Sequence, residues 1–121
     1  MRRDMEIIRS ILLSVSKSDE TIELNPLDPD DKLYDYHIDI LKQANFIFYK
    51  EKFEDMIPMI YIDEPRLTWE GNDYLDNISN PNVWNKTKKV IISKGFELSD
   101  VPFSIIKELA KNHIEDILGM K

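Results

Sequence analysis

The sequence has no cysteine and few glycines or histidines. Its 121 residues include no cysteine, three glycines and two histidines. Without cysteine there is no disulfide framework, thiol nucleophile or thiolate metal site. Three glycines leave little backbone for a phosphate-cradling loop, and neither a GxSxG nor an HExxH motif occurs. We therefore expect a protein that is not an enzyme and that holds no cofactor or metal.

Long hydrophobic runs are also missing. No apolar stretch approaches the roughly 20 residues that a helix needs to cross a bilayer. The N-terminal segment, MRRDMEIIRSILLSV, carries charges within its apolar stretch and lacks a small-residue cleavage site, so it does not resemble a signal peptide. These features predict a soluble, cytoplasmic protein without a membrane partner.

The composition that remains is typical of one globular domain. Hydrophobic residues make up 42% of the chain and aromatic residues 10%, which separates it from disordered sequences. A chain of 121 residues can bury one core and is short for two. We expect a single domain over residues 1–121.

Charge is distributed unevenly along the chain. The net charge of -7 disfavours nucleic-acid binding over the whole surface, because phosphate affinity comes from lysine and arginine. Residues 1–80 carry nine basic and eighteen acidic side chains, whereas residues 81–95 carry four lysines and no acid. This lysine-rich segment is the best candidate for a local anion-binding surface, and a solvated helix face is an equal alternative.

Hydrophobic spacing predicts five helices and three strands. Apolar residues recur at helical spacing over 4–15, 33–45, 69–78, 81–94 and 102–118. Runs rich in branched and aromatic residues predict strands over 21–24, 46–53 and 56–62.

Caps and turns add local detail. Asp30 or Asp31 is the expected cap of the 33–45 helix, Thr68 of the third helix and Asn80 of the fourth. Between the two hairpin strands only 54–55 are left to form the turn. Pro58 indicates an edge position, because proline has no amide hydrogen.

The order of helix, hairpin and new helix resembles the second half of a winged helix-turn-helix domain. The segment YHIDILKQANFI (36–47) is similar to the third-helix signature of bacterial winged-helix regulators, with Asn45 in place of their glycine. LTWEGNDYL (67–75) resembles the helix start that follows the wing. The resemblance implies an α+β fold with a winged-helix-like core over 1–79 and a helical extension over 80–121. The usual second helix is short or missing.

Nearly the whole chain also resembles a family of small bacterial and phage-associated proteins, domain of unknown function family 2513. The segments that carry this resemblance are RRDM (2–5), YHI (36–38), LTWEG (67–71), VWNKTK (83–88) and VPF (101–103). The resemblance implies a phage or mobile-element setting and no particular activity.

The candidate nucleic-acid-binding residues are polar residues of the 33–45 helix and its start, the wing and the lysine-rich helix. They are Lys32, Tyr36, Lys42, Gln43, Lys50, Lys52, Lys86, Lys88, Lys89 and Lys94. The outward helix face also carries Asp35 and Asp39, so a solvated face with Lys–Asp pairs is the favoured alternative there. The wing is acidic in composition, which is unfavourable for phosphate contact.

Several other side chains permit a structural or a functional role. His37 lies near the centre of an apolar helix face, so we expect a buried, hydrogen-bonded structural residue. Trp69 and Trp84 fit a binding surface or the core, and the core is favoured. Arg2 and Arg3 fit an anion contact or a solvated terminus, and the solvated terminus is favoured.

Two functions remain open. The first is a nucleic-acid-binding regulator that contacts DNA and forms a homodimer through its C-terminal helices. The second is a protein-interaction module or acidic adaptor that binds a basic protein partner. Fold resemblance favours the first and net charge the second, and we give slight preference to nucleic acid although fold alone is a weak indicator of function.

Overall fold

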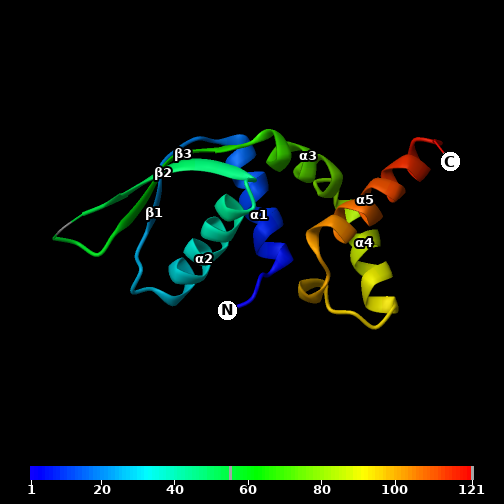
Figure 1. Ribbon diagram of the computed structural model, residues 1–121, viewed down its shortest axis with the longest axis horizontal. Helices are drawn as coiled ribbons and strands as arrows, with labels where there is room; N and C mark the ends of the chain where they lie inside the picture. Colours follow the sequence, from blue (N-terminus) through cyan, green and yellow to red (C-terminus); the bar gives the residue numbers. More distant parts are fainter. Residues whose placement is uncertain (55, 121) are drawn as a thin grey trace.

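The computed structural model describes residues 1–54 and 56–120 (Figure 1). Its elements are α1 (Met5–Lys17), β1 (Ile22–Leu24), α2 (Pro29–Gln43), β2 (Ile47–Phe53), β3 (Ile60–Leu67), α3 (Trp69–Ile78), α4 (Pro81–Ser93), the 3-10 turn η1 (Leu98–Asp100) and α5 (Phe103–Ile117). The strands form one antiparallel sheet in the order β1-β3-β2. The expected α+β class is confirmed.

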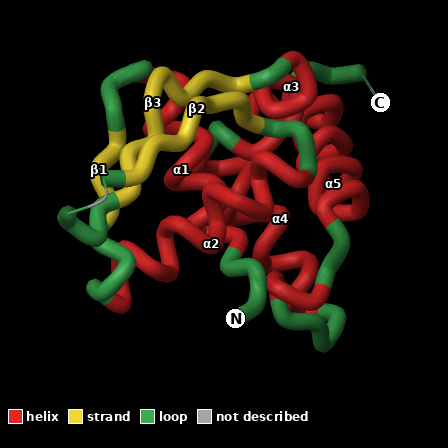
Figure 2. The backbone as a smooth tube through the Cα atoms, turned by 60° about the vertical axis from the view of Figure 1, so that its left-hand side comes forward, coloured by secondary structure: helices red, strands yellow, loops and turns green. Residues whose placement is uncertain are grey.

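Helix α1 is central to the packing. It contacts α2, α3 and β3, and its Ile8, Ile11 and Leu12 are fully buried. Ile38 and Leu41 of α2 are buried in the same core. Burying each such side chain contributes about 1.5–3 kcal/mol. The β2–β3 hairpin projects at one end of the molecule, and the C-terminal end of α5 lies at the other (Figure 1); the strands gather to one side of the helices (Figure 2).

The start of α2 differs from the prediction. Asp28, rather than Asp30 or Asp31, caps the helix, and its carboxylate accepts the N–H groups of both residues at 2.8 and 3.2 Å. Pro29 occupies the first turn, where its missing N–H costs nothing. The helix therefore begins four residues earlier than the apolar pattern indicates, and a short turn joins it to β1.

The other predicted caps agree with the structure. The Thr68 hydroxyl accepts the N–H of Gly71 at the start of α3, and the Asn80 side chain accepts two N–H groups at the start of α4. Asn45 has φ 62°, the left-handed conformation expected where related sequences have glycine.

The second hairpin strand was predicted wrongly. It spans Ile60–Leu67 instead of 56–62, and Pro58 lies in the turn before it. Ile60 and Ile62 reach the core, whereas Met56 is 94% exposed. Pairing with β1 and burial of alternate residues set the register, not the apolar character of 56–59. Of the predicted turn residues, Asp55 lies outside the described residues.

Strand β3 contains a β-bulge. The register with β2 shifts between Phe48 and Lys50, so that Tyr49 faces two residues, Glu64 and Pro65. Glu64 has φ 49°. A bulge tolerates proline because one residue is left out of the hydrogen-bond ladder. The bulge therefore explains a buried proline in the middle strand.

The LTWEG segment fastens α3 to the corner between α2 and β2. The Thr68 N–H donates to the Phe46 carbonyl at 3.0 Å, and the Thr68 hydroxyl donates to the Asn45 carbonyl. A Cβ atom at Gly71 would lie 1.9 Å from the Phe46 carbonyl oxygen. Only glycine permits this close approach.

The histidine and tryptophan predictions have mixed outcomes. His37 is fully buried and hydrogen-bonded, as expected, and Trp84 is 2% exposed. The preference for a core position is wrong for Trp69, which is 85% exposed at the first position of α3.

Candidate functional site

The predicted site residues do not form one surface. Helix α2 and the hairpin lie on one side of α1, whereas α4 and α5 lie on the other (Figure 1). Lys32, Tyr36, Lys42 and Gln43 are on α2 and Lys50 and Lys52 are on β2, but Lys86, Lys88, Lys89 and Lys94 are on α4 or at its end. The structure therefore divides them: Lys50 and Lys52 lie on the hairpin face opposite the buried Tyr49, Tyr36 and Gln43 line a groove beside the N-terminal segment, and the four lysines of the α4 region lie apart from both.

Several of these side chains are engaged within the protein. The Lys42 ammonium lies 4.5 Å from the centre of the Tyr49 ring, Lys52 pairs with Asp63 at 2.9 Å, and Lys88 pairs with Glu6 at 2.6 Å. Gln43 donates to Asp39. In the described part of the chain, Lys32, Lys50, Lys86, Lys89 and Lys94 have no ion pair.

The side of α2 that faces β2 is acidic. The pKa of Asp35 is raised because partial burial disfavours its charge and Asp39 repels it. The pKa of Glu51 is raised by burial and by Asp35, against the attraction of Lys42. This crowding of carboxylates repels phosphate and disfavours the side of α2 that carries Asp35 and Asp39 as a nucleic-acid contact.

The hairpin separates its charges by face. Ile47 and Tyr49 are buried and alternate with exposed Phe48 and Lys50, because successive side chains of a strand point to opposite faces. We define the outer hairpin face as Phe48, Lys50, Lys52, Asp63 and Arg66. This set holds three cations and one carboxylate. Tyr61, which pairs with Lys52 and with Glu23, lies on the same face and donates to Glu54, so two further carboxylates adjoin the set at its outer end.

Two contacts organise the outer hairpin face. The hydrogen bond between Lys52 and Asp63 lowers the pKa of Asp63 and raises that of Lys52. The Arg66 guanidinium lies 5.6 Å from the centre of the Phe48 ring. Phe48 remains 51% exposed, so one aromatic ring and two cations without an ion pair, Lys50 and Arg66, are accessible in the described structure.

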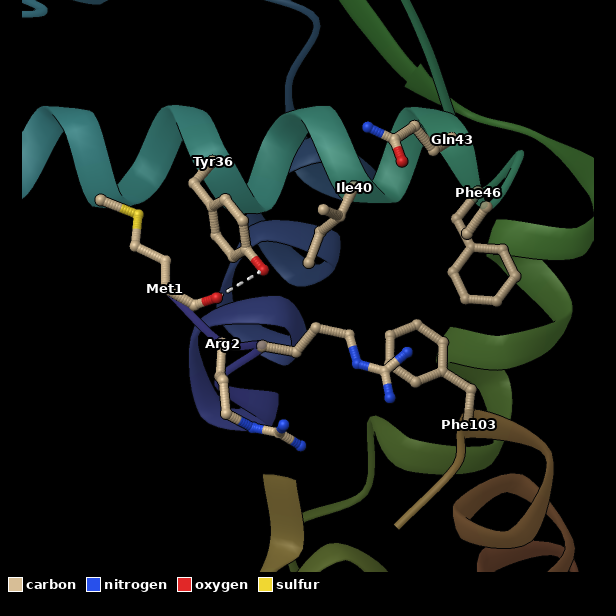
Figure 3. Close-up of a pocket in the computed structure, with 9 residues that line it drawn as sticks. Met1, Arg2, Tyr36, Ile40, Gln43, Phe46 and Phe103 are labelled. Carbon is tan, nitrogen blue, oxygen red and sulfur yellow. Dashed lines mark hydrogen bonds between the residues drawn. The ribbon is translucent and has the colours of Figure 1, made fainter. Parts of the chain in front are cut away.

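A cationic groove forms a second surface (Figure 3). It has a volume of about 680 Å³ and lies between the N-terminal segment, α2 and the start of α5. Its lining residues are Met1, Arg2, Arg3, Tyr36, Ile40, Gln43, Ala44, Phe46 and Phe103. All of them are described, and none is acidic.

The N-terminal segment is held in place as one wall of the cationic groove. Arg2 donates to Asp100 at 3.1 Å, and the Tyr36 hydroxyl donates to the Met1 carbonyl at 3.2 Å (Figure 3). The Arg3 guanidinium lies 4.8 Å from the centre of the Phe103 ring. The segment is exposed to solvent, as the favoured interpretation of a solvated terminus predicts, although it also makes these contacts within the chain.

An aromatic cluster lies at one end of the groove. The rings of Phe46 and Phe103 stack with centres 5.6 Å apart, and Tyr74 packs against both at 5.0 and 5.3 Å. The buried Tyr74 hydroxyl has no hydrogen-bond partner among the described residues. Burial raises its pKa, and the nearby charge of Arg3 acts in the opposite direction.

The sequence alone does not predict the groove, although the segments that carry the family resemblance supply several of its residues. RRDM supplies Arg2 and Arg3, YHI supplies Tyr36, and VPF supplies Phe103. LTWEG fixes the backbone of Phe46. These segments are far apart along the chain, so nothing in their local spacing indicated that they meet.

The described residues offer neither a metal cluster nor a membrane span. Across 1–54 and 56–120, no group of three His, Cys, Asp or Glu residues is placed to hold a metal ion. No helix in these ranges is long and apolar enough to span a membrane.

These features define a small α+β protein with a three-stranded antiparallel sheet. The chain belongs to the family described as Hypothetical protein (DUF2513), whose family model matches residues 2–97. This confirms the family expected from the sequence. The chain is also similar to an uncharacterized protein of Haemophilus influenzae (strain ATCC 51907 / DSM 11121 / KW20 / Rd), with 34% identity over 123 residues covering 98% of this chain and 100% of the relative. No solved structure matches.

Proposed function

We propose that this protein is a non-catalytic nucleic-acid-binding regulator, from a phage or mobile-element setting, that contacts its ligand through the outer hairpin face. The exposed Phe48 ring beside Arg66, with Lys50 on the same face, carries the proposal. Cations attract phosphates, and unpaired bases stack on exposed aromatic rings. The contact is therefore with an unpaired strand.

The arrangement of the N-terminal half supports the same class. Strand order β1-β3-β2, with α2 leading into the hairpin, resembles a winged-helix core. Helix-turn-helix proteins place a recognition helix in the major groove, braced by the helix before it. Here a short turn precedes α2, and Asp35 and Asp39 lie on that helix. The proposal therefore assigns the contact to the hairpin and not to α2.

Fluorescence anisotropy with a labelled oligonucleotide of mixed sequence, single-stranded and as a duplex, tests the proposal. The variant Lys50→Gln/Arg66→Gln removes the two unpaired cations of the face. Lys86→Gln/Lys89→Gln removes the same charge from exposed positions of α4. We expect salt-sensitive binding that prefers the single strand, about tenfold weaker in the hairpin variant and unchanged in the control.

Three results would contradict this proposal. Absence of binding at low salt would exclude nucleic acid as the ligand. An equal loss in both variants, or a loss in the α4 variant alone, would move the contact away from the hairpin.

A second candidate function is the binding of a basic protein segment. It is supported by the crowded carboxylates of Asp35, Asp39 and Glu51, whose repulsion a cationic partner would relieve. A polylysine peptide should then bind with salt sensitivity and bind more weakly to Asp39→Asn/Glu51→Gln. Equal binding by the variant would end this candidate.

We also propose a homodimer through the C-terminal helices. An apolar groove of about 420 Å³ lies between α4 and α5, where Phe96 is 59% and Ile105 is 50% exposed. Light scattering after size exclusion should give the mass of a dimer, and Ile105→Lys should give a monomer. A monomeric wild-type protein would exclude this proposal.

A further inference from the structure

We propose that the cationic groove binds a nucleoside monophosphate, an anion that carries a planar ring. The groove is separate from the outer hairpin face, so this site does not depend on the function proposed there. Its support comes from the charge of the groove and from its aromatic end.

The charge of the groove is opposite to that of the chain. The protein has a net charge of -7, yet the groove contains Arg2 and Arg3 and none of its lining residues is acidic. Arg2 uses one nitrogen on Asp100. Arg3 has no hydrogen bond or ion pair in the described part of the chain, and its guanidinium face covers Phe103. A guanidinium stacked on a ring still presents its N–H edge, which suits the oxygens of a phosphate.

The aromatic end of the groove, beside Arg3, offers apolar walls to a planar ring. Phe46 and Phe103 stack there, and Tyr36 and Ile40 of α2 form the facing wall (Figure 3). Aromatic and aliphatic walls bind bases through stacking, which tolerates any base. A volume of about 680 Å³ lies within the usual range for small-molecule sites. The groove therefore has room for both halves of a nucleotide.

Isothermal titration calorimetry with AMP, CMP, adenosine and inorganic phosphate tests the site. Both monophosphates should bind at least about tenfold more tightly than adenosine or phosphate alone, because only they contact both the arginines and the apolar walls. Arg3→Gln should weaken binding of AMP by about tenfold or more. Lys111→Gln, an exposed charge change on α5, should leave the affinity unchanged. Arg3 is exposed, so its substitution should not disturb folding.

Phe103→Leu tests the aromatic end separately, with circular dichroism as the check on folding. Folded Phe103→Leu should bind AMP more weakly while its response to phosphate is unchanged. The site would be overturned if no monophosphate binds to wild-type protein, if phosphate alone binds as tightly as AMP, or if Arg3→Gln binds AMP normally.

The same chemistry occurs at the 5′ end of a nucleic-acid strand. Competition with AMP by 5′-phosphorylated and 5′-hydroxyl oligonucleotides distinguishes a free nucleotide from the end of a strand as the ligand. It is measured with the Lys50→Gln/Arg66→Gln variant. Displacement of AMP only by the phosphorylated strand would support the site and extend it to strand ends. If this hairpin variant still binds AMP, nucleotide binding by the groove does not depend on the function proposed for the outer hairpin face.

Discussion

The imidazole of His37 accepts a hydrogen bond from the backbone N–H of Asp4 at 2.8 Å, across the junction of two helices. Its other nitrogen lies 2.8 Å from the Leu33 carbonyl, so the ring proton is on Nδ1 and Nε2 is the acceptor. Asp4 is the N-cap of α1. This buried side chain therefore fixes the start of α1 against α2 and sets the position of the adjacent Arg2 and Arg3.

Replacing His37 should destabilise the fold. His37→Leu leaves the Asp4 N–H without its buried acceptor, and the expected loss is about 1–3 kcal/mol of unfolding free energy. Urea denaturation followed by circular dichroism measures the loss. Lys89→Gln, at an exposed position, should change stability by less than about 0.5 kcal/mol. Equal stability of His37→Leu and wild type would show that the hydrogen bond is not required.

Gly71 should tolerate no side chain. Gly71→Ala would place Cβ 1.9 Å from the Phe46 carbonyl oxygen, so the backbone must move. We expect a loss of about 3 kcal/mol of unfolding free energy. Gly95→Ala is the matched control, because Gly95 has φ +87° but open space around it and should cost about 1 kcal/mol. Thermal unfolding of both variants compares them. A smaller loss at Gly71 than at Gly95 would refute the close approach.

The acidic side of α2 should lower stability at neutral pH. The raised pKa of Asp35 means that the native state binds its proton more readily than the unfolded state. Stability therefore falls as pH rises from the ordinary value of 3.8 through the raised pKa, and the loss persists above it. Asp35→Asn should be more stable than wild type at pH 7, with the gain disappearing below about pH 4.

Asp63 provides the opposite case for the same measurement. The pKa of Asp63 is lowered by hydrogen bonds from Lys52 and Thr21. The ionised carboxylate therefore contributes to stability above its ordinary pKa, and this contribution is lost as the pH falls through the lowered pKa. Asp63→Asn should therefore be less stable than wild type at pH 7 and equal to it in acid. Urea midpoints measured from pH 3 to 8 would reveal both signs. If Asp35→Asn and Asp63→Asn changed the stability at pH 7 in the same direction, the opposite pKa shifts assigned to Asp35 and Asp63 would be contradicted.

Arg9 should be required as arginine. Its guanidinium donates to the carbonyls of Ile78 and Ser79 at 2.8 and 2.7 Å, where α3 ends. Lysine cannot provide this fork, so Arg9→Lys should lose about 1–2 kcal/mol of stability. Lys17→Gln, at the exposed end of α1, should lose less than about 0.5 kcal/mol. Chemical denaturation measures the unfolding free energies. Equal unfolding free energies for Arg9→Lys and wild type would show that a single N–H donor at this position is enough.

Local signals predicted most helices and missed one strand. Thr68 and Asn80 were identified as caps because their side chains satisfy N–H groups only two or three residues away. The extent of β3 depends on which residues pair with β1 and reach the core, and 56–59 are as apolar as a strand without doing so. Pro58 was therefore assigned to a strand although it lies in the turn.

The candidate sites depend on distance along the chain in the same way. Alternation along β2 could have separated Lys50 and Lys52 from Glu51, because strand faces follow from local geometry. The cationic groove could not have been found this way. Arg3 and Phe103 are a hundred residues apart and meet only because α5 packs against α3, beside the N-terminal segment.

The sequence by itself determined the α+β class, the family, most helix boundaries and the buried role of His37, because periodicity, caps and burial of apolar faces act over a few residues. Tertiary structure alone decided the register of β3, the exposure of Trp69 and the cationic groove. Those features depend on which faces pack together, and packing is settled by the whole core at once.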